Sequence, residues 1–121
     1  MKYKLTENKR VISGKILYQI QALTDFADIK AGDLGGWIEK ESNLSQEGDC
    51  WVYGNAQVHG NAHVYGNAQV YGDAHVYGNA RVYGNAWVSE DAHVYGYARV
   101  YEDAYVYGYA KVYGDAQVHG D

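Results

Sequence analysis

The stretch Trp51-Val-Tyr-Gly-Asn-Ala-Gln-Val-His-Gly-Asn-Ala62 contains two copies of a six-residue unit that continues to the end of the chain. Every sixth residue from Val52 to Val118 is valine, and every sixth residue from Ala56 to Ala116 is alanine. The other positions hold a variable residue, a residue that is most often tyrosine, and usually a Gly-Asn or Gly-Asp pair. A short unbroken period of this kind predicts a solenoid, in which stacked repeats share one core.

Each unit is predicted to form one short β-strand and one corner. Alanine and valine alternate with the variable residue and tyrosine, which is the period-two pattern of a four-residue strand with one apolar face. Glycine accepts a positive φ, and Asn and Asp tolerate the left-handed region, so the pair that follows predicts a sharp corner. Since one such strand cannot bury its valine and alanine alone, neighbouring units must stack.

An aliphatic residue followed four positions later by a small one, as in Val52 and Ala56 or Val94 and Ala98, resembles the hexapeptide repeat of transferase-type parallel β-helices. The resemblance covers about residues 44–121. It implies an all-β fold, a single-stranded left-handed parallel β-helix of triangular section with about four to five coils, and the left hand rests on it alone. A flat meander of hairpins is the alternative, but its single-sided core would be exposed at every edge.

The first part of the chain lies outside the repeat and is predicted to cap it. We expect residues 1–36 to form a small antiparallel β cap with a loop, and residues 37–121 to form one continuous β-helix. Residues 15–23 alternate with one apolar face, containing Ile16, Tyr18, Ile20 and Ala22, which we expect to cover the open end of the repeat. Trp37 and Ile38 are expected to plug the same end of the core.

The glycine cluster at residues 31–36 predicts a tight loop after Thr24. It lacks the Gly-Lys-Ser/Thr ending of a phosphate-binding loop, and no helical pattern follows it. Further on, Leu44 and Cys50 fall in phase with the later alanines, so both are expected in the alanine position. Cys50 is then a small buried filler; the alternative, a reactive thiol, requires exposure and a neighbouring base.

The composition excludes several classes of partner. The net charge is −5 and the repeat holds only three basic residues, Arg81, Arg99 and Lys111, which argues against nucleic acid. One cysteine allows no intrachain disulfide. No apolar run reaches the length of a membrane span, and the N-terminus lacks a signal-type hydrophobic core. We expect a cytoplasmic protein, in the host cytoplasm if a phage encodes it.

Stacking of three units per coil places the outward residues in vertical rows. Each side then carries a tyrosine-rich ladder, in which rings one coil apart can stack. One side adds tryptophan to its tyrosines, and a large exposed aromatic patch marks an interface. The predicted binding surface comprises Trp51, Tyr53, Tyr71, Trp87, Tyr105, Tyr107 and Tyr109. The alternative is that these rings are structural staples.

Two corners replace glycine with an acid, at Glu90-Asp91 and at Glu102-Asp103. Solvated corners that discourage end-to-end association are one interpretation of this charge. A basic partner or a cation bound at these corners is the alternative.

Two enzyme classes share this type of repeat. The resemblance to acyltransferases implies a catalytic histidine beside an inserted loop, but no insertion interrupts the hexads after Trp51. The resemblance to γ-type carbonic anhydrases implies a zinc ion between subunits, for which His75 and His93, one coil apart in one row, are the candidates. Histidine also replaces tyrosine at positions 59 and 119, which favours substitution among outer rings. We therefore expect neither metal nor cofactor, and an enzyme is the alternative.

The whole chain, including residues 17–23 and 32–39, resembles small hexapeptide-repeat proteins of phages and bacterial genomes. This resemblance implies a phage or prophage accessory protein. The expected function is that of a non-catalytic binding or structural solenoid acting through protein contacts, with a host or defence protein as partner. The last unit stops at Gly120-Asp121 with no element covering it, which predicts a homo-oligomer, either a dimer or a trimer.

Overall fold

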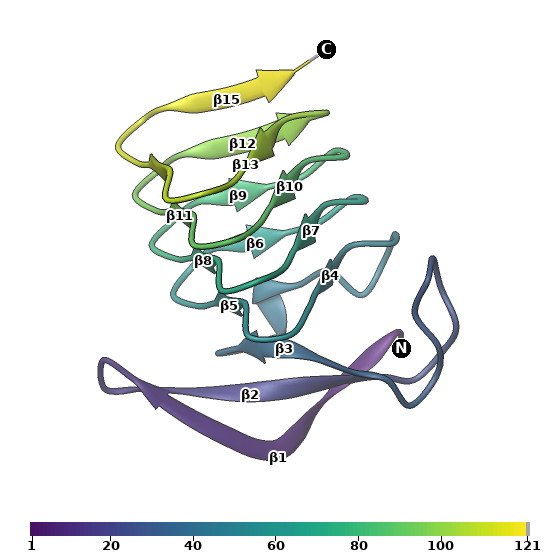
Figure 1. The fold of residues 1–121 in the computed structure, drawn as a ribbon. Helices are drawn as coiled ribbons and strands as arrows, with labels where there is room; N and C mark the ends of the chain where they lie inside the picture. Colours follow the sequence, from purple (N-terminus) through teal and green to yellow (C-terminus); the bar gives the residue numbers. More distant parts are fainter. Residues whose placement is uncertain (121) are drawn as a thin grey trace.

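The chain forms a triangular parallel β-solenoid of about five turns, standing on an N-terminal antiparallel cap (Figure 1). This computed structural model describes residues 1–120; Asp121, which entered the expectation about the last coil, lies outside them. The predicted all-β coil with an antiparallel β cap is confirmed.

Three sheets form the sides of the coil. One contains β4 (Trp51–Val52), β7 (Gln69–Val70), β10 (Trp87–Val88) and β13 (Tyr105–Val106). The second contains β6 (His63–Val64), β9 (Arg81–Val82), β12 (Arg99–Glu102) and β15 (Gln117–Gly120). The third contains β5 (Gln57–Val58), β8 (His75–Val76), β11 (His93–Val94) and β14 (Lys111–Val112), and continues through β3 (Leu34–Ile38) to β2 (Lys15–Ala22) and β1 (Tyr3–Ile12) of the cap.

Most strands of the coil have two residues rather than the predicted four, because tyrosine and alanine also belong to the corners. At one typical corner, the amide of Ala80 donates to the carbonyl of Tyr77 at 3.4 Å, which closes a turn around Gly78 and Asn79. The amide of Asn79 donates in turn to the carbonyl of Gly96 on the next coil at 2.8 Å. The corners are therefore hydrogen-bonded to each other along the solenoid, as the strands are.

The repeated valines and alanines form the core, as predicted. From Val52 to Val100 each of them is at most 1 % exposed. Corner glycines adopt positive φ, and the two glutamates at corner positions adopt the same conformation, with φ of 59° at Glu90 and 57° at Glu102. The glutamates thus replace glycine without changing the path of the chain.

The cap closes the first coil through β3. This strand pairs antiparallel with β2 and parallel with β5, so that Ile38 lies beside Val58. Ile38 is fully buried, as expected, whereas Trp37 lies on the outer side with the Arg10 guanidinium 4.3 Å from its ring centroid. In β2, Ile20 and Ala22 point into the core as predicted.

Two details of this end differ from the expectations. Ile16 is 45 % exposed, whereas Leu17 is buried outside the main core cluster, and the pairing of β2 with β3 is irregular between Gln19 and Gln21. The glycines Gly35 and Gly36 belong to β3 rather than to a loop. A Cβ on either would lie within 2.8 Å of residues on the next coil, so these glycines permit close packing instead of a turn.

The register of Leu44 also differs from the expectation. It follows a short 3-10 helix η1 (Glu41–Asn43) and bridges Val64, so it occupies a valine position and not the predicted alanine position. Trp51 pairs with Gln69, as the later coils do. The corner between Leu44 and Trp51 is therefore two residues longer than later corners, which a fixed six-residue phase does not anticipate.

Candidate binding surface

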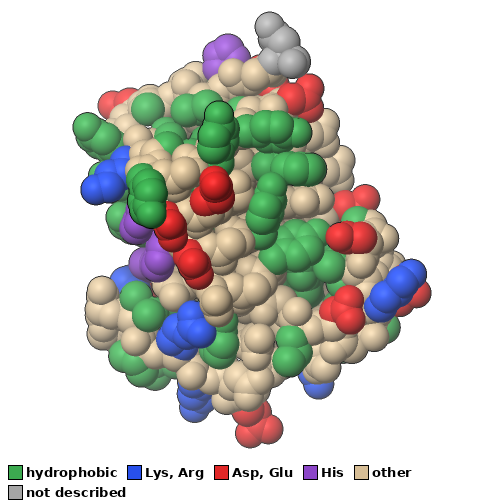
Figure 2. Space-filling view, in the orientation of Figure 1, with side chains coloured by type: hydrophobic (Ala, Val, Ile, Leu, Met, Phe, Trp, Pro, Cys, Tyr) green, Lys and Arg blue, Asp and Glu red, His purple; other side chains and the backbone are tan. Residues whose placement is uncertain are grey.

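The outer side of the β4-β7-β10-β13 sheet carries an exposed row of aromatic rings. We call the side chains of Tyr53, Tyr71, Trp87, Tyr105 and Tyr107 the aromatic face. Trp87 is 37 % exposed, Tyr105 60 % and Tyr107 64 %. Figure 2 shows hydrophobic side chains gathered over this sheet, with acidic side chains on either side of them.

Trp51, which was expected on this surface, is only 1 % exposed. The ring of Tyr3 lies 6.1 Å away and that of Phe26 lies 5.2 Å away, both edge-on to the indole. Strand β1 and the loop after β2 fold over the first coil and cover it. Trp51 therefore anchors the cap and is not available to a partner.

The tyrosine ladders predicted on the other two sides are confirmed. Tyr65 and Tyr83 stack with centroids 4.9 Å apart and planes 3° apart, and Tyr77 and Tyr95 stack at 5.0 Å and 4°. The stacks extend through neighbouring coils, with His59 and His119 taking ring positions at their ends. On these sides, stacked neighbouring rings cover most of the face of each ring.

The rings of the aromatic face are arranged differently. Tyr53 and Tyr71 have planes 82° apart, and Tyr71 and Trp87 have planes 76° apart, with centroids at 6.1 and 5.8 Å. The outward row that contains Trp87 has Gln69 on the coil below, where no ring is available for stacking. Trp87 stacks instead with Tyr105 above it, at 5.1 Å. The lower half of this face is thus left without a continuous stack.

A hollow of about 420 Å³ occupies that lower half, and Asp28, Tyr53, Gln69, Tyr71 and Trp87 line it. The Tyr53 hydroxyl donates a hydrogen bond of 3.0 Å to Oδ1 of Asp28, which reaches the sheet from the loop after β2. Burial, and then the Asp28 carboxylate, raise the pKa of Tyr53 well above its usual value, so its hydroxyl stays a donor at neutral pH. The hollow therefore combines aromatic walls with a carboxylate that is held in place.

The acidic corners flank the aromatic face on both edges. The corner between this sheet and the β5-containing sheet carries Asp73, Glu90 and Asp91, and the corner that precedes β13 carries Glu102 and Asp103. Oε2 of Glu90 accepts from the Gly108 amide at 3.1 Å, and Oε1 of Glu102 lies 3.1 Å from Nδ1 of His119.

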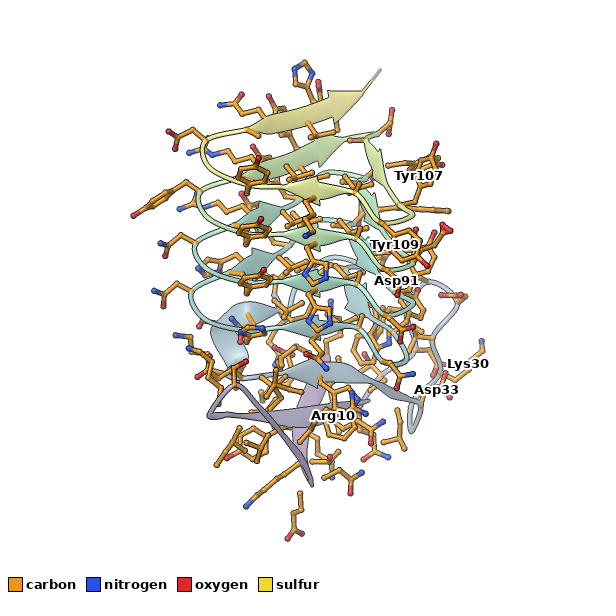
Figure 3. The ribbon with its side chains drawn as sticks, turned by 60° about the vertical axis from the view of Figure 1, so that its left-hand side comes forward. Arg10, Lys30, Asp33, Asp91, Tyr107 and Tyr109 are labelled. Carbon is orange, nitrogen blue, oxygen red and sulfur yellow. The ribbon has the colours of Figure 1, made fainter. Side chains whose placement is uncertain are left out.

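Tyr109, another predicted surface residue, stands at the first of these corners and is 83 % exposed. It follows Tyr107 on the coil above Asp91, and Figure 3 shows the three side chains close together at one edge of the solenoid. The basic residues of the repeat, Arg81, Arg99 and Lys111, belong to the other two sheets. The aromatic face thus has an acidic rim.

His75 and His93 lie on neighbouring coils, as predicted, with ring centroids 4.8 Å apart and planes 3° apart. In a stack of this kind the in-plane lone pairs run side by side and do not converge on one point. Burial, and then His93, lower the pKa of His75, which favours the neutral ring. Within residues 1–120, no three His, Cys, Asp or Glu side chains come together as a metal site would require.

Cys50 is fully buried, which confirms the expected filler role. Burial raises the pKa of its thiol, although Nζ of Lys2, 3.4 Å from Sγ, acts in the opposite direction. The position of Lys2 was not anticipated: its ammonium donates to the carbonyl of Cys50 at 2.8 Å and lies 4.9 Å from the ring centroid of Phe26. Nothing in the pattern around Lys2 distinguishes it from the other lysines of the cap.

Comparison with known proteins supports the repeat architecture. Residues 68–82 and 74–90 match the family model described as "YdcK Beta solenoid repeat". A protein of Escherichia coli (strain K12) named "Uncharacterized acetyltransferase YdcK" is 45 % identical to this chain over 60 residues. The aligned part covers 43 % of this chain and 18 % of that relative, so the chain spans less than a fifth of the relative's length. The chain is a β-solenoid repeat protein distantly related to it.

The helical structure in residues 1–120 includes nothing with the length and hydropathy of a membrane-spanning helix.

Proposed function

We propose that this chain is a non-catalytic β-solenoid that binds a protein partner through the aromatic face. The observation that carries the proposal is the contrast between sides: on two sides the rings form stacks that continue over several coils, whereas the aromatic face has a single stacked pair, Trp87 and Tyr105, beside tilted rings and the exposed Tyr107. Flat, partly exposed aromatic surfaces with a charged rim are typical of protein interfaces, whose binding energy concentrates in Trp, Tyr and Arg.

The regularity of the coil also supports a binding role. Between β4 and β15 the corners follow one another without an inserted loop, so this segment builds no wall around a substrate. Catalysis needs groups held around a reacting atom, and enclosed, convergent polar sites are where such groups are found. A flat side of a solenoid is better suited to another flat surface.

The resemblance to small phage and prophage proteins supports a finer proposal about context. In this finer proposal, the chain is a phage or prophage accessory protein that forms a homo-oligomer and binds a host or defence protein. An oligomer would repeat the aromatic face and so increase avidity without any new contact.

A hexapeptide-repeat enzyme with a site between subunits is the second candidate, favoured by the distant relationship to a protein named as an acetyltransferase. The family model matches inside the repeat, at residues 68–82 and 74–90, and one fold can serve both binding and catalysis. Acetyl-coenzyme A binding measured by calorimetry discriminates the two: the binding proposal expects none.

The binding proposal is tested by partner recovery from host lysate, coupled to native mass spectrometry of the recovered complexes. The test variant is Trp87→Ala combined with Tyr107→Ala, and the matched control is Tyr113→Ala, which removes a ring that is 58 % exposed on another sheet. We expect the wild type and the control to recover the same partner at a fixed mass, and the test variant to lose it. Equal recovery by all three proteins, or recovery by none, contradicts the proposal.

A further inference from the structure

We propose that the hollow on the aromatic face receives an arginine side chain of the protein partner. This inference rests on the proposed function, since it assigns the chemistry of the group that the aromatic face recognises. It starts from the five residues that line the hollow, Asp28, Tyr53, Gln69, Tyr71 and Trp87.

The walls suit a planar cation. Three aromatic rings line the hollow, and Tyr71 lies nearly perpendicular to both Tyr53 and Trp87, at 82° and 76°, so the rings do not fill the space as one continuous stack. The face of an aromatic ring carries partial negative charge and attracts a cation within about 6 Å of its centroid. Since Gln69 is the residue between the rings, the space above it is left open for a ligand.

The charge around the hollow is complementary to a cation. Asp28 contributes a carboxylate at the rim, and its bond from Tyr53 uses Oδ1, which leaves Oδ2 for a second donor. Both edges of the sheet carry acids, Asp73 and Asp91 on one side and Asp103 on the other. Lys30, on the same loop as Asp28, is exposed and extends at the outer edge of the molecule in Figure 3.

Arginine fits this combination better than lysine. Its guanidinium is flat, less strongly hydrated than an ammonium, stacks on aromatic faces and presents a fork of N–H donors to a carboxylate. A guanidinium placed over an aromatic ring also occurs within this protein, where the Arg10 guanidinium lies 4.3 Å from the centroid of the Trp37 ring. At the hollow, an incoming guanidinium would find both a ring face and the free Asp28 oxygen.

The arginine belongs to the surface of a protein partner, and the ligand is not a small free cation. The hollow continues upward into exposed rings, with Tyr105 stacked on Trp87 and Tyr107 beside it. A partner that inserts one arginine can cover these rings at the same time, which a small cation cannot do. Arginine anchors in aromatic pockets surrounded by contacts that exclude water are typical interface hot spots.

The test uses the full chain labelled with ¹⁵N and three short capped peptides, Gly-Arg-Gly, Gly-Lys-Gly and Gly-citrulline-Gly. Citrulline has the shape of arginine without its charge. The indole N–H signal of Trp87 is followed by NMR during titration, and the signals of Trp37 and Trp51 serve as internal controls, since Trp51 is buried. We expect the arginine peptide to shift the Trp87 signal saturably, with about fivefold tighter binding than the citrulline peptide.

The matched variants are Asp28→Asn and Asp115→Asn. Asparagine keeps an oxygen that can accept from Tyr53, so Asp28→Asn removes charge from the hollow while preserving the contact. Asp115 lies at the corner between β14 and β15, away from the aromatic face, and its change alters net charge equally. We expect about fivefold weaker arginine-peptide binding for the first variant and no change for the second, with both melting like the wild type.

Equal shifts from the arginine and citrulline peptides, or equal losses in the two variants, overturn the arginine assignment. The assignment is also overturned if none of the three peptides shifts the Trp87 signal at any concentration in the titration, or if the lysine peptide binds more tightly than the arginine peptide. If the Trp87→Ala, Tyr107→Ala protein still loses its partner in the recovery experiment, the aromatic face remains the binding surface and only its ligand chemistry is wrong. If recovery is unaffected while the arginine preference holds, the proposed function fails and the hollow is a cation site without that partner.

Discussion

The corner glycines allow a direct test of how the coils stack, through Gly78→Ala compared with Gly54→Ala. Both glycines have positive φ, 68° and 56°, so alanine strains the backbone at either position. Their surroundings differ. A Cβ on Gly78 would lie 2.9 Å from the Gly96 nitrogen of the next coil, whereas a Cβ on Gly54 meets no atom within 4 Å.

The expected magnitudes follow from these two facts. Placing an L-residue in the left-handed region costs about 1 to 2 kcal/mol, of which the lower entropy of the unfolded alanine chain offsets about 0.4 to 1 kcal/mol. We therefore expect Gly54→Ala to lower the free energy of unfolding by about 1 kcal/mol. Gly78→Ala adds the cost of overpacking against backbone that is held at 2.8 Å by the Asn79 to Gly96 hydrogen bond, about 1 to 3 kcal/mol more.

Urea unfolding at 25 °C, followed by tyrosine and tryptophan fluorescence, measures both changes. Gly78→Ala should be less stable than Gly54→Ala by at least about 1 kcal/mol, with the same slope of free energy against urea. If the two variants are equally stable, the coils are not packed corner on corner, and positive φ alone explains the glycines.

Two further predictions concern the outer rings. Tyr83 stacks on Tyr65 and Tyr101, at 4.9 and 5.2 Å, so Tyr83→Ala should cost about 1 to 3 kcal/mol by thermal unfolding. Tyr97→Ala, which removes a corner ring that is 65 % exposed, is its control, and equal losses refute the ladder's contribution. Burial, and then His75 and Lys15, lower the pKa of His59 against the opposing effect of Glu39. The unfolded chain, with a histidine pKa near 6.5, then binds the proton better, so stability is full above about pH 6.5 and falls as the pH drops below it. His59→Phe keeps the ring and should reduce that fall in urea unfolding at pH 5.5 relative to pH 8; an unchanged pH dependence contradicts the assignment.

Inside the repeat, the sequence period predicts most of the structure. Valine and alanine at a fixed phase determine which side faces inward, and the period determines which outer residues lie above one another. The prediction that His75 sits below His93 is correct because each intervening corner has the same length. Strand length was overestimated, since the alternation of side chains continues into the turns while the ladder does not.

Outside the repeat, contacts between distant segments decide the structure, and no period reveals them. Asn43 is the clearest example. Its Oδ1 accepts from the Glu39 and Lys40 amides, and its Nδ2 donates to the carbonyls of Gly60 and Ala62, at 2.9 to 3.1 Å. In sequence it looks like any other corner asparagine, yet it is fully buried. The burial of Trp51 is of the same kind, because it depends on where the cap folds.

The binding surface shows the same division between periodic and non-periodic information. The period assigns Tyr53, Tyr71 and Trp87 to one side, but it does not give the tilt of their rings or the approach of Asp28 from the cap. Two residues interrupt the outward rows of this side, Gln69 below Trp87 and Ser89 above Tyr71, and the Tyr71 ring lies nearly perpendicular to those of Tyr53 and Trp87.

The three sides of this solenoid share one backbone geometry, so differences between them arise from the outward residues and from the segments of the cap that reach the first coil. On the other two sides the tyrosines of successive coils stack face to face, so neighbouring rings cover most of the ring faces there. On the side that lacks rings at Gln69 and Ser89, the rings of Tyr53, Tyr71 and Trp87 lie edge-on to one another beside the Asp28 carboxylate. Aromatic side chains contribute binding energy when a partner buries surface that was exposed before binding. An interrupted ladder leaves such surface exposed, so it is where a repeat of this kind can acquire a binding function without any change in its core.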